Sequence, residues 1–456
     1  MKKTLIVLSM ALLMAGMVTG CNEDSESMVT PKTEVKPDSI QISTDSTEAE
    51  KKPESPETDS FVVNRLPLAQ PMKLTDEQKK LVQKSNTFSM SLFATINSLD
   101  KEKRSNFLSP ISVTYMLGML NNGAAGITSK EIMSMLGFGE SDTKVVNELC
   151  KALIDGAPQV DPNVKVEISS YIAANSHLNI KLEDLFKKDM ETYYNAEAAS
   201  LDFSSPDALK TINGWCSEKT DGKIEKIIDE LDDNSVLVML NAVNFKASWV
   251  SKFDKNDTSK EMFTMDNGDT RELPMMHQKA LVRFASNETY STLLLPYGGT
   301  NAEWYMYILL PQDHKTVEDV LEKLHDVDWT KAFWETDIYT VDIKLPRFTT
   351  QSENFLNSSI KKMGAPSIFD PAKAEFPKLS NFEKMYVNKM LQKAAIEINE
   401  KGTEAVAITL SEWASGSAEH DPFLKKAHFN CDSPFVYVIQ ERSSGAIFFI
   451  GTFRGE

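Results

Sequence analysis

One segment near the C-terminus of this 456-residue chain, EINEKGTEAVAITL at 397–410, constrains the fold more than any other. After Gly402 every second side chain is small, namely Thr403, Ala405, Ala407, Thr409 and Ser411. The intervening side chains are large, namely Val406, Ile408 and Leu410. On a strand these two sets point to opposite faces. A segment with one small-residue face can enter a packed sheet without the overpacking penalty of about 1–3 kcal/mol per site.

The segment alone also fits an ordinary edge strand followed by a polar loop. Together with FNCDSPFVYVIQERSSGAIFFIGTF at 429–453, it resembles the reactive-loop hinge and C-terminal signature of the serpins, the serine protease inhibitor family. Further matches follow in the family's order: SNFLSPISVTYMLGMLNNGAAGITSKEIMSMLGF from 105, INGWCSEKTDGKIEKII from 212, LVMLNAVNFKASWVSKF from 237, LPMMHQ from 273, LLLPYGG from 293, YMYILLP from 305 and VDIKLPRFT from 341. Ordered matches along most of the chain are more specific than any single motif.

Helical and strand patterns are interspersed without strict alternation, which predicts an α+β fold with largely antiparallel sheets. Apolar spacing predicts a helix that Thr75 caps and a buried helix that Ser109 caps. Further helices are predicted at 129–136, 182–194, 208–219 and 317–324. Strands are predicted at 166–174, 235–245, 291–297, 304–311, 340–348, 434–440 and 446–453. The resemblance implies the serpin fold, with three mostly antiparallel sheets, eight or nine helices and an exposed reactive loop.

The N-terminus reads as a processing signal. Lys2 and Lys3 precede an apolar run too short for a confident membrane span, and VTG before Cys21 resembles a bacterial lipobox. We therefore expect a lipoprotein signal peptide at 1–20, a lipidated Cys21 followed by a disordered linker to residue 72, and a serpin domain at 73–456. Lipidation implies anchoring at a bacterial outer membrane or cell surface, facing the periplasm or the exterior. NEDSES after Cys21 fits either a surface-export signal or a solvated charge run.

Composition and motifs argue against several functions. The formal net charge of −17 disfavours nucleic-acid binding, which needs a basic face. Cys150, Cys216 and Cys431 lack metal-ligand spacing, so we expect buried thiols, with one disulfide as the alternative. HExxH, GxSxG and glycine-rich phosphate loops are absent from the sequence. We therefore expect no catalytic residue, metal or cofactor, although a triad of distant Ser, His and Asp is defined only by geometry.

The resemblance implies a protease inhibitor that acts as a suicide substrate through cleavage and insertion of its reactive loop. The implied hinge residues are Glu400, Gly402, Thr403, Glu404, Ala405, Ala407 and Thr409. The family's usual interval from Gly402 places the scissile bond at Gly416–Ser417, and a longer interval to Pro434 leaves a nearby bond open. The flanking sequence WASGS favours elastase-like serine proteases or papain-like cysteine proteases as partners of a monomeric inhibitor. The alternative is a non-inhibitory serpin that serves as a surface binding or structural protein.

The resemblance also assigns residues that control opening of the central sheet. Ser109, Ser112 and Asn241 match the family's shutter beneath the sheet, and Trp249 matches a tryptophan near its top. Gln392 stands where serpins usually have a shutter histidine. A neutral amide both donates and accepts hydrogen bonds, so the network can persist without the pH dependence of an imidazole.

Overall fold

Eight α-helices lie within residues 68–299, 301–403 and 425–456, which are the residues that this computed structural model describes. They are α1 (Asp76–Leu99), α2 (Pro110–Gly123), α3 (Gly126–Met135), α4 (Thr143–Gly156), α5 (Asp184–Tyr194), α6 (Pro206–Lys219), α7 (Val317–Leu324) and α8 (Asn357–Lys362). Short 3₁₀ helices are η1 (Ala157–Gln159), η2 (Ser176–Leu178), η3 (Lys255–Asp257), η4 (Ala332–Glu335) and η5 (Pro366–Phe369). Helix α4 was not predicted from the sequence.

The strands form two hydrogen-bonded sheets. The six-stranded sheet has the order β10 (Phe348–Phe355), β11 (Lys389–Asn399), β12 (Gly402–Thr403), β4 (Leu237–Ser248), β2 (Val164–Asn175) and β3 (Glu197–Leu201). The nine-stranded sheet has the order β1 (Asn106–Leu108), β15 (Ala446–Phe453), β14 (Phe435–Glu441), β8 (Trp304–Pro311), β7 (Tyr290–Tyr297), β6 (Thr270–Ser286), β9 (Asp337–Pro346) and β13 (Lys425–Asn430), with β5 (Ser259–Thr264) paired to β6.

Most strand pairs are antiparallel, so the predicted α+β class with largely antiparallel sheets is confirmed. Parallel pairing joins β11 to β4, β2 to β3 and β13 to β9. Strand β6 is long enough to pair with β5 and β9 along most of its length and with β7 through its last residues. It thereby connects two of the three expected sheets into one continuous ladder.

The helix N-termini confirm one predicted cap and correct the other. Thr75 forms a reciprocal capping box with Gln78 at the start of α1, as predicted. Ser109 does occupy the N-cap position of α2, but its hydroxyl makes no capping bond, so that prediction is wrong. Its backbone is held by Gln392 instead. Helix α2 is buried along nearly its whole length, as its uniformly apolar sequence predicts.

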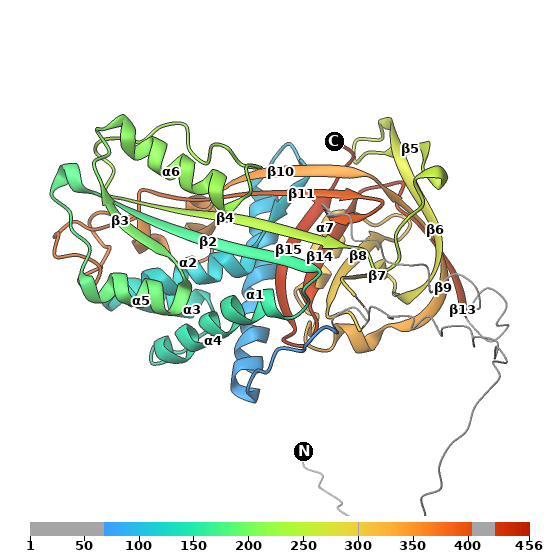
Figure 1. Cartoon of the computed structure of the whole chain (residues 1–456), viewed down its shortest axis with the longest axis horizontal. Helices are drawn as coiled ribbons and strands as arrows, with labels where there is room; N and C mark the ends of the chain where they lie inside the picture. Colours follow the sequence, from blue (N-terminus) through green and yellow to red (C-terminus); the bar gives the residue numbers. More distant parts are fainter. Residues whose placement is uncertain (1–67, 300, 404–424) are drawn as a thin grey trace, which may run out of the picture. The chain divides into compact units, whose positions relative to one another are not determined.

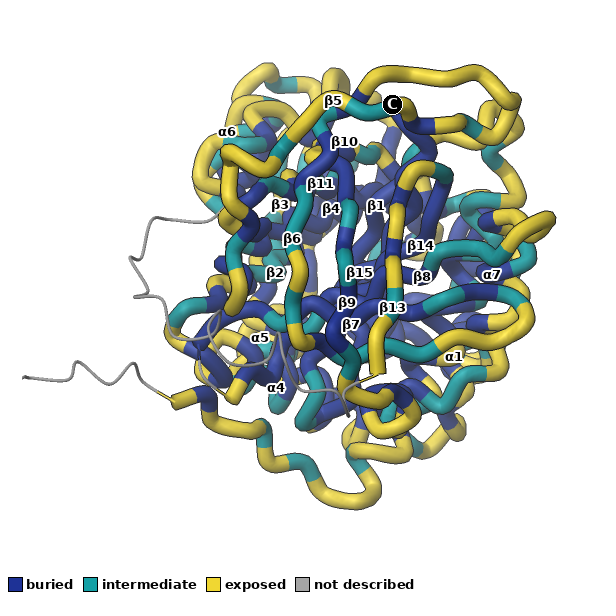
Figure 2. The backbone as a smooth tube through the Cα atoms, turned by 90° about the vertical axis from the view of Figure 1, so that its right-hand side faces the viewer, coloured by how far each residue is buried: buried dark blue, intermediate teal, exposed yellow. Residues whose placement is uncertain are grey.

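The six-stranded sheet is covered on both faces. Helix α6 lies on one side of it, and α2 with α5 lies on the other (Figure 1). On the α2 side its side chains join the main apolar core, whereas Leu240 and Leu391 join a smaller core beneath α6. Burial is complete along β14 and β15 and is low along β13, which forms one edge of the nine-stranded sheet (Figure 2).

The N-terminal predictions fall on residues that the structure does not describe. These are the signal peptide, Cys21 and the linker up to residue 67. In the described part of the chain, no helix is both long and apolar enough to cross a bilayer.

The three cysteines of the folded region test the packing directly. Cys150, Cys216 and Cys431 are buried free thiols, so the alternative of a disulfide among them is wrong. Burial raises the pKa of Cys150 and of Cys216 to about 12 and raises that of Cys431 well above its usual value.

We therefore expect these three thiols to react with Ellman's reagent at pH 8 only after unfolding, because reaction needs an exposed thiolate. Rapid reaction in the native protein would contradict this packing.

Candidate functional site

Strands β11 and β4 form a fork in the centre of the six-stranded sheet. They pair directly from Lys389 with Val238 to Lys393 with Ala242. Beyond that point, pairing between the two strands stops in the described part of the chain. At the far end β12 lies between them, with Thr403 opposite both Ile398 and Ala247. The sheet is therefore closed at one end and already holds the first hinge residues at the other.

The hinge enters the fork with a glycine and a threonine. Gly402 has φ of +140°, and a Cβ there would collide with the carbonyl of Ala247, so only glycine fits this entry. The Thr403 side chain is 1% exposed, and its hydroxyl shares a hydrogen bond of 2.5 Å with Tyr297. Burial raises the pKa of Tyr297 well above its usual value, so the phenol stays neutral. Thr403 thus already occupies a core position.

Contacts of Trp249 and Glu400 fix the chain where it enters the hinge. The indole of Trp249 stacks on Tyr297 with ring centroids 4.2 Å apart, and its Nε1 donates to the carbonyl of Asn399 over 3.0 Å. The Glu400 carboxylate is ion-paired with Arg347 and accepts from the Thr258 hydroxyl at 2.9 Å. Burial alone would raise the pKa of Glu400, but these partners bring it below its usual value.

The shutter residues predicted from the sequence meet where the fork closes. Gln392 Nε2 donates to the backbone oxygen of Ser109 at 2.9 Å, to Ser112 Oγ at 2.6 Å and to Asn241 Oδ1 at 3.2 Å. Gln392 Oε1 accepts from the backbone N–H of Ser109 at 2.7 Å. Both ends of this fully buried amide are therefore satisfied. The glutamine joins β11 to both β4 and α2.

Asn241 was expected to hydrogen-bond with both Ser109 and Ser112, and of these two it contacts only Ser112 directly. It accepts from Ser112 Oγ at 2.8 Å and donates to Ser170 Oγ at 3.2 Å. It makes no direct bond to Ser109, whose hydroxyl is buried without a partner in the described part of the chain. The expected link between Asn241 and Ser109 therefore runs through Ser112 and Gln392.

Three residues at the hinge were not predicted from the sequence. Tyr297, Arg347 and Thr258 contact it from segments about fifty residues or more away along the chain. No local pattern marks them, because each contact exists only once the fold brings these segments together. The predicted hinge residues Glu404, Ala405, Ala407 and Thr409 and the predicted bond Gly416–Ser417 lie outside the described residues.

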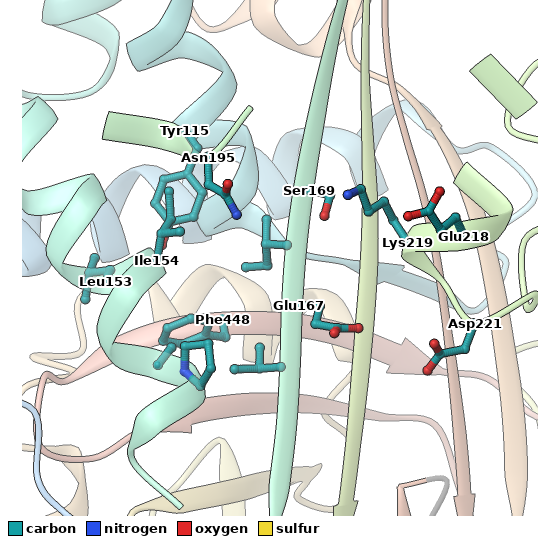
Figure 3. Close-up of a pocket in the computed structure, with 14 residues that line it drawn as sticks. Tyr115, Leu153, Ile154, Glu167, Ser169, Asn195, Glu218, Lys219, Asp221 and Phe448 are labelled. Carbon is teal, nitrogen blue, oxygen red and sulfur yellow. The ribbon is translucent and has the colours of Figure 1, made fainter. Parts of the chain in front are cut away.

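A cavity of about 340 Å³ borders β2 level with the fork. Here β2 has a free outer edge, because its pairing with β3 begins only at Tyr171. Side chains on both sides of this strand line the cavity, as Figure 3 shows for Tyr115, Ile154 and Phe448 on one side and Glu167, Ser169 and Asp221 on the other.

Comparison with known proteins identifies the family. A family model described as "Serpin (serine protease inhibitor)" matches residues 83–455. The leukocyte elastase inhibitor of Homo sapiens is 30% identical over 390 residues, which cover 82% of this chain and 99% of that protein. Serine protease inhibitor A6 of Xenopus laevis is 30% identical over 387 residues, which cover 83% of this chain and 84% of that protein. The chain therefore belongs to the serpin family.

Solved structures confirm the serpin fold. The thermophilic serpin tengpin in its native state matches with a TM-score of 0.75 and 25% identity, over 86% of this chain and 98% of that chain. Arabidopsis AtSerpin1 in its native stressed conformation matches in fold with a TM-score of 0.73 and 22% identity, over 83% of this chain and 98% of that chain.

A histidine in the shutter should introduce a pH dependence that the neutral amide of Gln392 does not provide. In Gln392→His, burial should disfavour the charged imidazole and lower its folded pKa below the unfolded value of about 6.5. The unfolded state then binds more protons below about pH 6.5, so the variant should lose stability relative to the parent as pH falls from 7.5 to about 5. We expect the Tm difference between the two proteins to widen over that interval.

The exposed Gln351 on β10 offers a matched control. Gln351→His should keep a constant Tm difference from the parent, because an exposed imidazole titrates similarly in the folded and unfolded states. A constant Tm difference for Gln392→His as well would contradict the assigned role of this buried amide.

Proposed function

We propose that this serpin is an inhibitory suicide substrate. The main support is the pairing of β12, whose two residues already lie between β11 and β4 at the open end of the fork. A protease that attacks the reactive loop would form an acyl-enzyme. The hinge would then continue into the fork before water hydrolyses the ester. Insertion of about fourteen residues at 3.3 Å each would carry the bound protease about 45 Å along the sheet.

Extension of the observed register explains the small-residue face. Thr403 lies opposite Ile398 and Ala247, so each further residue would move one position along both strands. Ala405 would then lie between Ile396 and Phe245. All these positions face the main apolar core, which is already packed and would accept only small side chains.

The same register accounts for the large residues on the other face. Leu410 would lie between Leu391 and Leu240, which belong to the smaller core beneath α6. A buried leucine there gains the hydrophobic stabilisation that a solvent-exposed position would not provide. At Leu410 the bulky face of the segment would thus meet a second apolar layer.

Insertion must break the shutter. Thr409 would arrive between Gln392 and Asn241, which are hydrogen-bonded to each other in the closed sheet. The Thr409 hydroxyl both donates and accepts hydrogen bonds, so it could replace part of the bonding between Gln392 and Asn241. We infer that the shutter is the barrier which holds the sheet closed until cleavage.

The free edge of β2 favours opening of the sheet. Widening the fork requires β4 and β2 to move away from β11. Residues 164–170 of β2 pair only with β4 in the described part of the chain, so their movement breaks no bonds to β3. The cavity beside this edge leaves space for the shift.

Displacement of the protease would inactivate it by distorting its catalytic site. Loss of a single oxyanion-hole donor slows turnover by about 10²–10³, so distortion of several elements would stall deacylation. The sequence WASGS and the similarity to leukocyte elastase inhibitors favour elastase-like serine proteases as targets. Papain-like cysteine proteases are the second target class.

A charge on the small-residue face should convert the inhibitor into a substrate. Thr403→Arg would place an unpaired guanidinium in the core position beside Tyr297, which is costly. We expect this variant to be cleaved by elastase without forming the SDS-stable complex that the parent forms. Lys401→Arg, at an exposed position two residues earlier, should keep the parent's complex.

A second variant separates insertion from local damage at the hinge. Ala407→Arg should behave like Thr403→Arg, since the register extension places both side chains on one face. If both arginine variants still formed the complex, insertion along this register would be wrong. If the parent were cleaved by elastase, trypsin, subtilisin and papain without any adduct, a non-inhibitory binding or structural role would replace the proposal.

We also propose that the protein is a lipoprotein anchored through Cys21 to a bacterial outer membrane or cell surface. The support is the lipobox-like VTG before Cys21 and the polar segment that follows it. Two or more acyl chains give stable anchoring, because each buried methylene contributes about 0.8 kcal/mol. The polar segment would place a monomeric inhibitor domain within reach of proteases in solution.

Replacement of Cys21 should release the protein from the membrane. In a bacterial host, Cys21→Ser should fail to incorporate an alkyne-labelled fatty acid and should leave the membrane fraction. The matched control Cys150→Ser, at a buried thiol of the folded domain, should keep both label and fractionation. Incorporation of the label by Cys21→Ser would contradict lipidation at this site.

A further inference from the structure

A second, smaller cavity of about 210 Å³ lies away from the hinge, between β7, β8 and the segment that links α7 to β9. Its inner wall includes Tyr307 and Leu309 of β8 together with Val327 and Trp329 of the linking segment. Glu335 is at its rim. Gln440 Nε2 donates to the backbone oxygen of Trp329 at 2.7 Å, which fixes that segment against β14.

Two residues that line this cavity carry fully buried hydrogen-bond donors without a partner in the described part of the chain. They are the hydroxyl of Tyr307 and the indole Nε1 of Trp329, whose side chains are 1% and 3% exposed. The two rings are in edge contact, with centroids 5.6 Å apart. Other buried donors also lack partners, but these two line one cavity together. Buried polar groups are nearly always hydrogen-bonded, so two neighbouring unpaired donors indicate that an acceptor is missing.

The chemistry of the wall restricts what could supply that acceptor. Burial raises the pKa of Tyr307 well above its usual value, so the phenol keeps its proton and can donate. An indole N–H only donates. The remaining wall combines the apolar side chains of Leu309 and Val327 with polar residues such as Asn287 and Thr292, and the carboxylate of Glu335 at the rim disfavours an anion. The volume equals the liquid share of about seven water molecules, which is enough for a compact organic molecule.

We propose that this cavity binds a compact, uncharged organic molecule whose apolar body packs against Leu309 and Val327 and whose carbonyl oxygen accepts hydrogen bonds from Tyr307 and Trp329. The site is independent of loop insertion, because it includes no residue of the fork, the hinge or the shutter. Because both donor atoms are themselves fully buried, the two rings must reorient toward the cavity when the ligand binds.

The test compares acetophenone with cumene, which is similar in size but has a tetrahedral carbon with a second methyl group in place of the planar carbonyl. Acetophenone should bind the full-length protein with a dissociation constant on the order of 1 mM, as expected for a ligand of this size. Cumene should bind more weakly by about fivefold or more, since it leaves both donors unpaired. In a ¹⁵N-labelled sample, acetophenone should shift the indole N–H resonance of Trp329 downfield, with Trp329→Phe assigning that signal among the six tryptophans.

Variants separate the hydrogen bond from simple filling of space. Tyr307→Phe should weaken acetophenone binding about fivefold and leave cumene unchanged. Ala332→Leu, which fills the cavity from η4, should abolish binding of both probes. The matched control Tyr437→Phe removes another buried hydroxyl, outside this cavity, and should alter neither affinity.

Three results would overturn the proposal. The first is equal affinity for acetophenone and cumene. The second is unchanged acetophenone binding by Tyr307→Phe. The third is the absence of saturable acetophenone binding up to about 10 mM, which would assign the cavity to water alone. Protease inhibition by the same samples should be unaffected in every case, so failure here leaves the inhibitory proposal standing.

Discussion

The closed end of the fork between β11 and β4 is the constraint on which the rest of the structure depends. Direct pairing of the two strands stops at Lys393 and Ala242 in the described part of the chain. Gln392 reinforces the closed end by joining β11 to Asn241 of β4 and to Ser112 of α2. We propose that these few polar contacts determine whether the central sheet can accept another strand.

The opposite end of the fork is held in a partly inserted arrangement. Thr403 is in the core, while Glu400 is held by Arg347 and Asn399 by the indole of Trp249. The hinge therefore has a fixed starting register. We infer that the inserted form is more stable than the native form chiefly because of the core positions that the small residues beyond Thr403 would occupy. The loop buries these side chains only when it moves into the sheet.

The sequence predicted those parts of the site whose signal is local. Alternating small residues after Gly402, together with the resemblance to serpins, predicted the hinge, and the resemblance also marked Gln392 as a replacement for the usual shutter histidine. Contacts between residues far apart in the sequence could not be predicted. No local sequence pattern indicates that Arg347 pairs with Glu400 or that Tyr297 bonds to Thr403. The merging of two expected sheets also escaped prediction, since it depends on how far β6 continues past its partners.

The Tm of the protein before and after cleavage within residues 404–424 tests the central claim most directly. If the native sheet lacks a strand that the loop supplies, the free energy of unfolding of the nicked protein should be several kcal/mol higher than that of the intact protein. Its Tm should rise by several degrees or more, at about 1 °C per kcal/mol for a domain of this size. An unchanged or lower Tm after complete cleavage would contradict the account, because the closed fork would then be the most stable form of the sheet.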